Sequence, residues 1–246
     1  MGRACILRLS LYVHEDQTMS DPQHTEDLGA ARKAALFDMD RTLIRKDTAS
    51  LYMRHQRDRG HVRKRDALRV AWWLLQYTFG VVNAERVAEQ AMQGFRGRRE
   101  DWLEQTMREV HDQYVRPLIC DAGRRAVERH QQAGDWVAIV TGATPYAALP
   151  LAAELGIEHV ICTRIEVAEG RFTGKVQQPM CYGPGKVTLT EREAQRHGVS
   201  LDGAVFYSDS ITDLPLLERV ETPVAVNPDS RLQRVARRRG WRIERW

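Results

Sequence analysis

Two aspartates stand one residue apart where an apolar run ends. Residues 34–47 read AALFDMDRTLIRKD, so Asp38 and Asp40 directly follow the apolar residues, and a hydroxyl follows at Thr42. Two neighbouring carboxylates at the end of a buried strand repel each other and lose hydration, which is costly unless a cation or a reaction uses them. The pair therefore marks a candidate site for binding a cation or for catalysis.

Other polar residues follow similar apolar runs later in the chain. Thr141 and Gly142 lie in VTGATP, Lys186 opens a helical pattern in YGPGKVTLTE, and Asp209 and Asp213 lie in YSDSITDLP. The carboxyl ends of parallel strands meet at one edge of a sheet, so we expect these side chains around one crevice. Clustered carboxylates suit Mg²⁺, and a lysine with a hydroxyl would hold phosphoryl oxygens. The set predicts phosphoryl transfer, in which positioning and charge neutralisation do most of the catalysis.

Each of these residues also has a plainer interpretation. The aspartates could cap turns or helices, and Thr141 could cap the helix that follows its strand. Lys186 could lie at the surface, but lysine is scarce in this chain. The 246 residues contain 37 basic side chains, of which five are lysines. The four groups together favour the catalytic interpretation over separate structural roles.

The elements that would position these residues alternate along the chain. Short runs that are apolar on both faces are typical of strands in a parallel sheet covered by helices. Helical patterns between them, several ending at glycine, predict a Rossmann-like, doubly wound α/β core with a β-hairpin extension. The predicted strands are 33–38, 135–141, 158–163, 204–209 and 223–226; the helices are 121–134, 145–156 and 185–198; the hairpin is 164–176.

The domain organisation follows from a break in this alternation. Residues 48–115 show helical repeats only, such as Leu103, Met107, Val110 and Tyr114, and predict a helical cap inserted where the first carboxylates emerge. The catalytic core would then comprise 31–47 and 116–246. Residues 1–30 are predicted to be a flexible N-terminal segment, and translation could begin at Met19.

The four groups resemble the ordered motifs of the haloacid dehalogenase superfamily. DMDRTL resembles its DxDxT motif, and the helical insertion resembles the cap of the phosphoserine-phosphatase-like branch. The resemblance implies that Asp38 is the nucleophile that forms an aspartyl-phosphate and that Asp40 is the general acid and base. It implies Mg²⁺ held by Asp38, the Asp40 carbonyl and Asp209, with Asp213 supporting the metal site. Phosphate would bind Thr141, Gly142 and Lys186.

Two residues near the first motif leave alternatives open. In phosphoserine phosphatases a carboxylate at the distance of Asp47 contacts the substrate amino group, but Asp47 could equally cap a helix in KDTASLY. Arg41 stands where relatives often have a small residue. Its side chain could bind the phosphate or the leaving group, or it could face solvent.

Composition excludes several other classes of protein. The chain is 43% hydrophobic and 28% charged, with a net charge of +4, which is ordinary for a soluble enzyme. Arginines are interleaved with acidic residues, so we expect no nucleic-acid partner. The C-terminal tail from residue 231 reads as a solvated helix and a final strand.

Four scattered cysteines indicate neither zinc nor disulfides and favour a cytoplasmic protein. The isolated histidines are expected mostly on polar helix faces.

The predicted function is a Mg²⁺-dependent phosphomonoesterase acting on a small phosphorylated metabolite. The resemblance suggests a phosphoserine-like or histidinol-phosphate-like substrate. The apolar window 70–82, with Trp72 and Trp73, is too short to span a membrane and predicts either core packing or a bilayer-surface contact. A surface contact would suit a lipid phosphate, such as a lysophospholipid or phosphatidylglycerophosphate. A catalytically retired binding or regulatory relative is the third hypothesis, and nothing in the sequence indicates an oligomeric state.

Overall fold

A computed structural model describes residues 32–60 and 92–246 of the chain. The predictions for the N-terminal segment and Met19 lie outside these ranges. So does the apolar window 70–82, on which the membrane-surface hypothesis depends. Within the two described ranges, no helix is both long and apolar enough to cross a bilayer.

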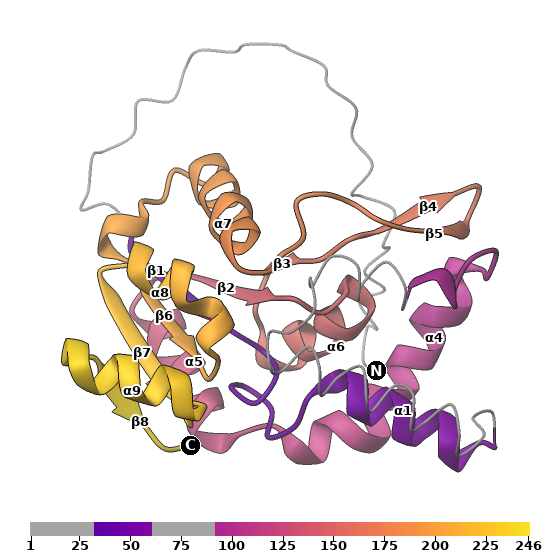
Figure 1. Ribbon diagram of the computed structural model, residues 1–246, viewed down its shortest axis with the longest axis horizontal. Helices are drawn as coiled ribbons and strands as arrows, with labels where there is room; N and C mark the ends of the chain where they lie inside the picture. Colours follow the sequence, from indigo (N-terminus) through magenta and orange to yellow (C-terminus); the bar gives the residue numbers. More distant parts are fainter. Residues whose placement is uncertain (1–31, 61–91) are drawn as a thin grey trace, which may run out of the picture. The chain divides into compact units, whose positions relative to one another are not determined.

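Six parallel strands form the central sheet, in the order β3-β2-β1-β6-β7-β8 (Figure 1). All five predicted strands are present, and the sixth lies in the C-terminal tail, as expected. The strands are β1 (Ala34–Phe37), β2 (Trp136–Thr141), β3 (His159–Cys162), β6 (Val205–Ser208), β7 (Thr222–Val226) and β8 (Arg242–Glu244). Strand β1 lies between β2 and β6, so three of the four predicted groups follow three adjacent strands.

Helices α5 (Asp121–Gln132) and α6 (Pro145–Leu155) pack on one face of this sheet, and α7 (Pro184–Arg196), α8 (Leu214–Arg219) and α9 (Ser230–Arg239) pack on the other. Two further helices, α1 (Thr48–Asp58) and α4 (Glu100–Val110), lie in the region predicted as a cap. Shorter helical turns span His111–Val115, Arg116–Leu118, Leu201–Gly203 and Ile211–Asp213. The three predicted helices correspond to α5, α6 and α7. Gly134, Gly156 and Gly198, which follow them, all have positive φ, as expected for helix ends.

The alternation of side chains along β1 divides the core into two layers. Ala35 and Phe37 pack in one buried cluster with residues of α5 and α6. Ala34 and Leu36 point to the other face and pack with residues of α7, α8 and α9. Every residue of β1 is therefore buried, which explains why its sequence is continuously apolar.

The predicted hairpin is formed by β4 (Ile165–Ala168) and β5 (Arg171–Val176), which pair antiparallel. Its far end is joined to the chain just before α4. The Gly97 amide donates to the Phe172 carbonyl at 2.8 Å, and the Phe172 amide donates to the Arg98 carbonyl at 3.0 Å. Backbone hydrogen bonds therefore connect the hairpin to the region predicted as a cap.

The described part of residues 48–115 contains α1 and α4, which contact each other. Leu103, Met107 and Val110 form the buried stripe that the spacing predicts. The next position differs, because the helix widens into a π-helical turn after Val110. Val115 is buried there, and Tyr114 is only half-buried, with its hydroxyl donating to Asp58 at 2.9 Å. The division into core and cap stays a prediction.

Candidate active site

A buried ammonium and two carboxylates form the centre of the site. Lys186 Nζ lies 3.0 Å from Asp38 Oδ1 and 2.7 Å from Asp213 Oδ1. Ser208 Oγ donates to Asp213 Oδ2 at 2.7 Å. Lys186 is 2% exposed and Asp213 is 4% exposed, so these charges pair with one another rather than with water. The structure thus joins three of the four predicted groups in one network.

The start of α7 explains how Lys186 reaches this position. Gly183 has φ 51° and Pro184 begins the helix, where its fixed φ and missing N–H cost nothing. A Cβ on Gly185 would lie 2.2 Å from the Met180 carbonyl oxygen, so only glycine fits there. The sequence GPGK therefore packs the first turn of α7 tightly against the preceding loop and fixes Lys186 above the ends of the strands.

The turn after β1 is also tightly fixed. The Asp38 amide donates to the Tyr207 carbonyl at 2.9 Å, which extends the pairing of β1 with β6 to the first aspartate. The Met39 carbonyl then accepts from the amides of Thr42, Leu43 and Ile44. The Thr42 hydroxyl is buried and has no hydrogen-bond partner among the described residues.

Asp40 is oriented by the first residue of α1. The Thr48 amide donates to Asp40 Oδ1 and the Thr48 hydroxyl donates to Oδ2, both at 3.1 Å. Burial raises the pKa of Asp40 to about 7, with a further contribution from the charge of Asp38, while the bonds from Thr48 oppose the rise. Near neutral pH this carboxyl can therefore both donate and accept a proton.

Asp47 caps α1. Its Oδ1 accepts from the Ser50 amide at 2.9 Å and from the Ser50 hydroxyl, and its Oδ2 lies 3.5 Å from an Nη2 atom of Arg41. Burial acts to raise the pKa of Asp47, but the Ser50 hydrogen bonds and the Arg41 charge lower it below its ordinary value. Of the two roles considered for Asp47, the structure shows the helix cap.

Arg41 has a backbone conformation that favours glycine. Its φ is +60°, a left-handed value that costs a residue with a Cβ about 1–2 kcal/mol. Its side chain is 56% exposed, and an exposed ion pair such as the one with Asp47 returns about 0–1 kcal/mol. The contact with Asp47 therefore does not offset the strain of having an arginine at this position.

Asp209 follows β6 and is the least compensated carboxylate of the site. It is 8% exposed, and its side chain has no hydrogen bond or ion pair to any residue in the described ranges. Burial raises its pKa to about 8, the negative charges of Asp38 and Asp213 add to the rise, and the Arg41 charge opposes it. Such a group requires a proton or a cation.

Asp38 and Lys186 each shift the pKa of the other. Burial raises the pKa of Asp38 to about 6, the Lys186 charge opposes this rise, and Asp213 adds to it. Burial alone would lower the pKa of Lys186, but the charges of Asp213 and Asp38 raise it well above its ordinary value. Lys186 is therefore a permanent cation beside Asp38.

Thr141 and Gly142 end β2 at the same edge of the sheet. Thr141 is buried, and its Oγ1 accepts from the Ala143 amide at 3.1 Å, which leaves the hydroxyl proton to donate elsewhere. Gly142 is exposed, and a Cβ there would meet the Cys181 carbonyl at 3.5 Å, an ordinary contact. The helix-cap alternative for Thr141 is wrong, because Thr144 occupies the cap position of α6.

Sequence reasoning missed three residues that support the site. Thr48 orients Asp40, and Ser208 donates to Asp213. Asp229 accepts from the Ile211 amide at 2.8 Å, and its own amide donates to the Asp209 carbonyl at 2.8 Å, so it holds the loop after β6. Ser208 and Asp229 both lie at or just after the ends of strands, and this position could have identified them from the sequence. No comparable pattern marks Thr48.

Two histidines are exceptions to the expectation that most of them lie on polar faces. His55 is 1% exposed and His111 is 4% exposed. His55 Nε2 lies 3.4 Å from Glu109, and His111 Nε2 lies 3.1 Å from Glu154. Each histidine is therefore buried against an acidic side chain from another helix, at a position far away in the sequence.

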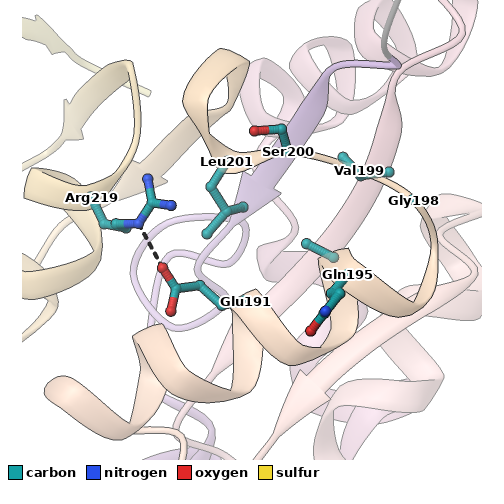
Figure 2. A pocket seen from close by; sticks show the side chains of 8 residues that line it. Glu191, Gln195, Gly198, Val199, Ser200, Leu201 and Arg219 are labelled. Carbon is teal, nitrogen blue, oxygen red and sulfur yellow. Dashed lines mark hydrogen bonds and ion pairs between the residues drawn. The ribbon is translucent and has the colours of Figure 1, made fainter.

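A shallow cavity of about 440 Å³ lies elsewhere, beside the C-terminal half of α7 (Figure 2). Val199 and Leu201 line it, and Arg219 Nε donates to Glu191 at 2.6 Å on its rim. The loop that lines it leads into β6 at residue 205, whereas Asp209 leaves the other end of that strand. The cavity is therefore separate from the strand ends that carry the carboxylates.

Comparison with known proteins identifies the family. A family model described as haloacid dehalogenase-like hydrolase matches residues 35–218, which contain all the site residues predicted from the sequence. The chain belongs to the haloacid dehalogenase-like hydrolase family. It is 35% identical over 229 residues to phosphoserine phosphatase SerB1 of Mycobacterium tuberculosis, covering 91% of this chain and 73% of the relative. It is 29% identical to a histidinol-phosphatase of Neisseria meningitidis, covering 86% and 98% respectively.

Two solved structures have a similar fold. A protein of unknown function from Bordetella pertussis Tohama I superimposes with a TM-score of 0.80 at 30% identity, covering 87% of this chain and 99% of its own. A phosphoserine phosphatase, determined as an analogue of the phospho-aspartyl intermediate, gives a TM-score of 0.66 at 18% identity over 87% and 93% of the two chains. The family match and the curated phosphatase relatives place the chain in the phosphoserine-phosphatase-like branch and support a phosphoric monoester hydrolase.

Proposed function

We propose that this chain is a Mg²⁺-dependent phosphomonoesterase that acts through an aspartyl-phosphate on Asp38. One observation carries the proposal: the buried Lys186 ammonium joins Asp38 to Asp213 at strand ends that also present the uncompensated Asp209. An ammonium held beside a carboxylate at this distance restrains it as an anion, which is the form that attacks phosphorus.

In the first step, a carboxylate oxygen of Asp38 attacks the phosphorus atom. The new bond joins that oxygen to phosphorus, and the bond between phosphorus and the ester oxygen breaks. Lys186 donates to Oδ1 of Asp38, and we assign the attack to Oδ2, which lacks this hydrogen bond. Asp40, whose pKa of about 7 leaves it partly protonated at neutral pH, gives its proton to the departing alcohol.

In the second step, water attacks the phosphorus of the aspartyl-phosphate. Asp40, now ionised, takes the proton of this water, and the bond from phosphorus to Asp38 breaks to release phosphate. The two hydrogen bonds from Thr48 hold both oxygens of Asp40, so the same carboxyl stays in place for both proton transfers. The Thr141 hydroxyl, the backbone near Gly142 and Lys186 would bind the phosphoryl oxygens.

The residues present fit a magnesium ion. Asp209 is buried without a hydrogen bond or ion pair to any described residue, and the pKa values of Asp38 and Asp209 are raised. No cluster of three or more His, Cys, Asp or Glu side chains arranged to hold a metal occurs in the described ranges. Mg²⁺ commonly uses only one or two carboxylates and completes its shell with waters and phosphate oxygens.

Asp38, Asp209 and the Asp40 carbonyl would therefore hold the ion, and Asp213 would support them from its bond with Lys186. The bound ion would neutralise charge on the transferring phosphoryl group. We further propose a small phosphorylated metabolite in the cytoplasm as the substrate. The support is the relatedness to enzymes named phosphoserine phosphatase and histidinol-phosphatase.

The test measures hydrolysis of p-nitrophenyl phosphate by purified protein with Mg²⁺ and with EDTA. Asp38→Asn is expected to lower kcat by about 10⁴-fold or more, because the nucleophile is lost. Asp202→Asn, an exposed aspartate bound to Arg219, is the control and should retain full activity. Equal rates in EDTA would contradict the metal requirement, and an active Asp38→Asn would contradict the nucleophile. No hydrolysis of any phosphate ester would favour the retired relative.

A further inference from the structure

An arginine stands beside Asp40 in a turn whose backbone is fixed by hydrogen bonds. Arg41 directly follows Asp40, and the turn around it is held by three amides that donate to the Met39 carbonyl. The left-handed φ of +60° is sterically unfavourable for arginine, and glycine would adopt it freely. A strained residue beside catalytic groups points to a use for its side chain.

The partner of Arg41 is already engaged. Asp47 Oδ1 accepts both the amide and the hydroxyl of Ser50, and Oδ2 faces Arg41. Asp47 therefore already has three hydrogen-bonding contacts within the protein. Arg41 contacts it with one nitrogen at 3.5 Å, and the arginine side chain is 56% exposed, so its other N–H donors are accessible.

From this geometry we infer that Arg41 forms a subsite for an oxyanion on the leaving group of the substrate. The inference rests on the proposed function, in which Asp40 protonates the leaving alcohol. Arg41 contacts Asp47, and the next residue, Thr48, binds both oxygens of Asp40. The guanidinium therefore lies close to the carboxyl that protonates the leaving alcohol. A carboxylate or a second phosphate would accept two parallel N–H bonds from it.

The exchange of partners requires no rearrangement of α1. When an oxyanion takes the guanidinium from Asp47, the Asp47 carboxylate keeps its two hydrogen bonds from Ser50 and remains the helix cap. The site then selects phosphate esters by the charge of the leaving group. Anionic leaving groups are preferred over neutral ones, and neutral ones over cationic ones.

The test compares esters whose leaving groups have two carbons and different charges. These are phosphoglycolate (anionic), ethyl phosphate (neutral) and O-phosphoethanolamine (cationic), with ethane-1,2-diol bisphosphate as a second anion. We expect kcat/KM of the wild type to be at least about 10-fold higher for phosphoglycolate than for ethyl phosphate. A higher value still for the bisphosphate would identify phosphate, rather than carboxylate, as the bound oxyanion.

The decisive quantity is the ratio of kcat/KM for phosphoglycolate to that for ethyl phosphate within each variant, which cancels any general loss of activity. Arg41→Gly should lower this ratio by about 10-fold, and Arg41→Lys should keep part of it. Arg45→Gly, which removes another exposed arginine four residues later, should leave the ratio unchanged.

An unchanged ratio in Arg41→Gly, or a wild type without preference for the anionic ester, would overturn the inference. Failure of the proposed function would appear differently, as hydrolysis of ethyl phosphate by Asp38→Asn. The two results are separable because one compares substrates and the other removes the nucleophile.

Discussion

The two halves of the site differ in how firmly their charges are held. Around Lys186, the side chains of Asp38, Asp213 and Ser208 are all buried and are joined at 3.0 Å or less. At the turn before α1, Arg41 meets Asp47 at 3.5 Å, and the arginine is largely exposed. We name these the buried half and the turn half.

The difference separates two tasks. Charges with little access to water interact strongly, and removing one leaves its partner uncompensated, so the buried half has a single arrangement. Exposed charges interact weakly and are screened by salt, so the turn half can exchange one partner for another. A reaction common to many phosphate esters suits the first, and recognition of a particular leaving group suits the second.

The largest expected effect breaks the buried half. Lys186→Met removes the ammonium and leaves Asp38 and Asp213 without their cation, so the free energy of unfolding should fall by roughly 3–5 kcal/mol. Urea denaturation measures this free energy of unfolding. Lys175→Met removes an exposed lysine on β5 and serves as the matched control, with an expected change within about 0.5 kcal/mol. Equal changes in the free energy of unfolding for the two substitutions would show that the buried ion pairs of Lys186 do not stabilise the fold.

Metal binding provides the second test of the buried half. The folded-state pKa of Asp209 is about 8 and that of Asp38 about 6, both above the ordinary value of 3.8. The folded protein thus binds more protons than the unfolded chain between about pH 4 and pH 8, and metal-free stability should fall as pH rises through this window. Mg²⁺ should reverse the loss.

Thermal unfolding at pH 5 and pH 8, with EDTA and with Mg²⁺, measures this. At about 100 times its dissociation constant, Mg²⁺ should add about 2.7 kcal/mol at pH 8 and less at pH 5, where protons compete for the carboxylates. Asp209→Asn should lessen both the fall with pH and the gain from Mg²⁺, whereas the surface variant Asp202→Asn should retain both. The same gain at both pH values would contradict the role of Asp209.

Much of this site was predictable because its residues follow strands. Asp38, Thr141 and Asp209 each stand at or just after the end of a continuous apolar run, and parallel pairing brings such ends to one edge whatever the intervening sequence. The motif containing Lys186 was predictable for another reason, since its glycines mark a tight helix start. Local patterns and sheet topology were sufficient for these residues.

The remaining features depend on contacts between elements, which no local pattern reveals. Thr48 binds Asp40 only because α1 begins beside the turn after β1. In the sequence His55 has no pattern that distinguishes it from the polar residues of α1, but in the fold Glu109 of α4 lies against it. The π-helical turn after Val110 buries Val115 in place of Tyr114, although the three- and four-residue spacing favoured Tyr114. Tertiary packing determined each of these outcomes.

The smallest expected effect sharpens the contrast from the turn half. Arg41→Gly removes the left-handed strain and an ion pair worth little, so the free energy of unfolding should rise by about 1 kcal/mol even as the preference for anionic esters falls. Arg45→Gly makes the same chemical change at a residue without positive φ, where the added chain entropy should lower stability by about 0.5–1 kcal/mol. Urea denaturation of the two variants compares them directly. Opposite signs would mean that Arg41 is retained at a cost in stability, whereas equal losses would mean that the turn is unstrained and that its arginine needs no functional explanation.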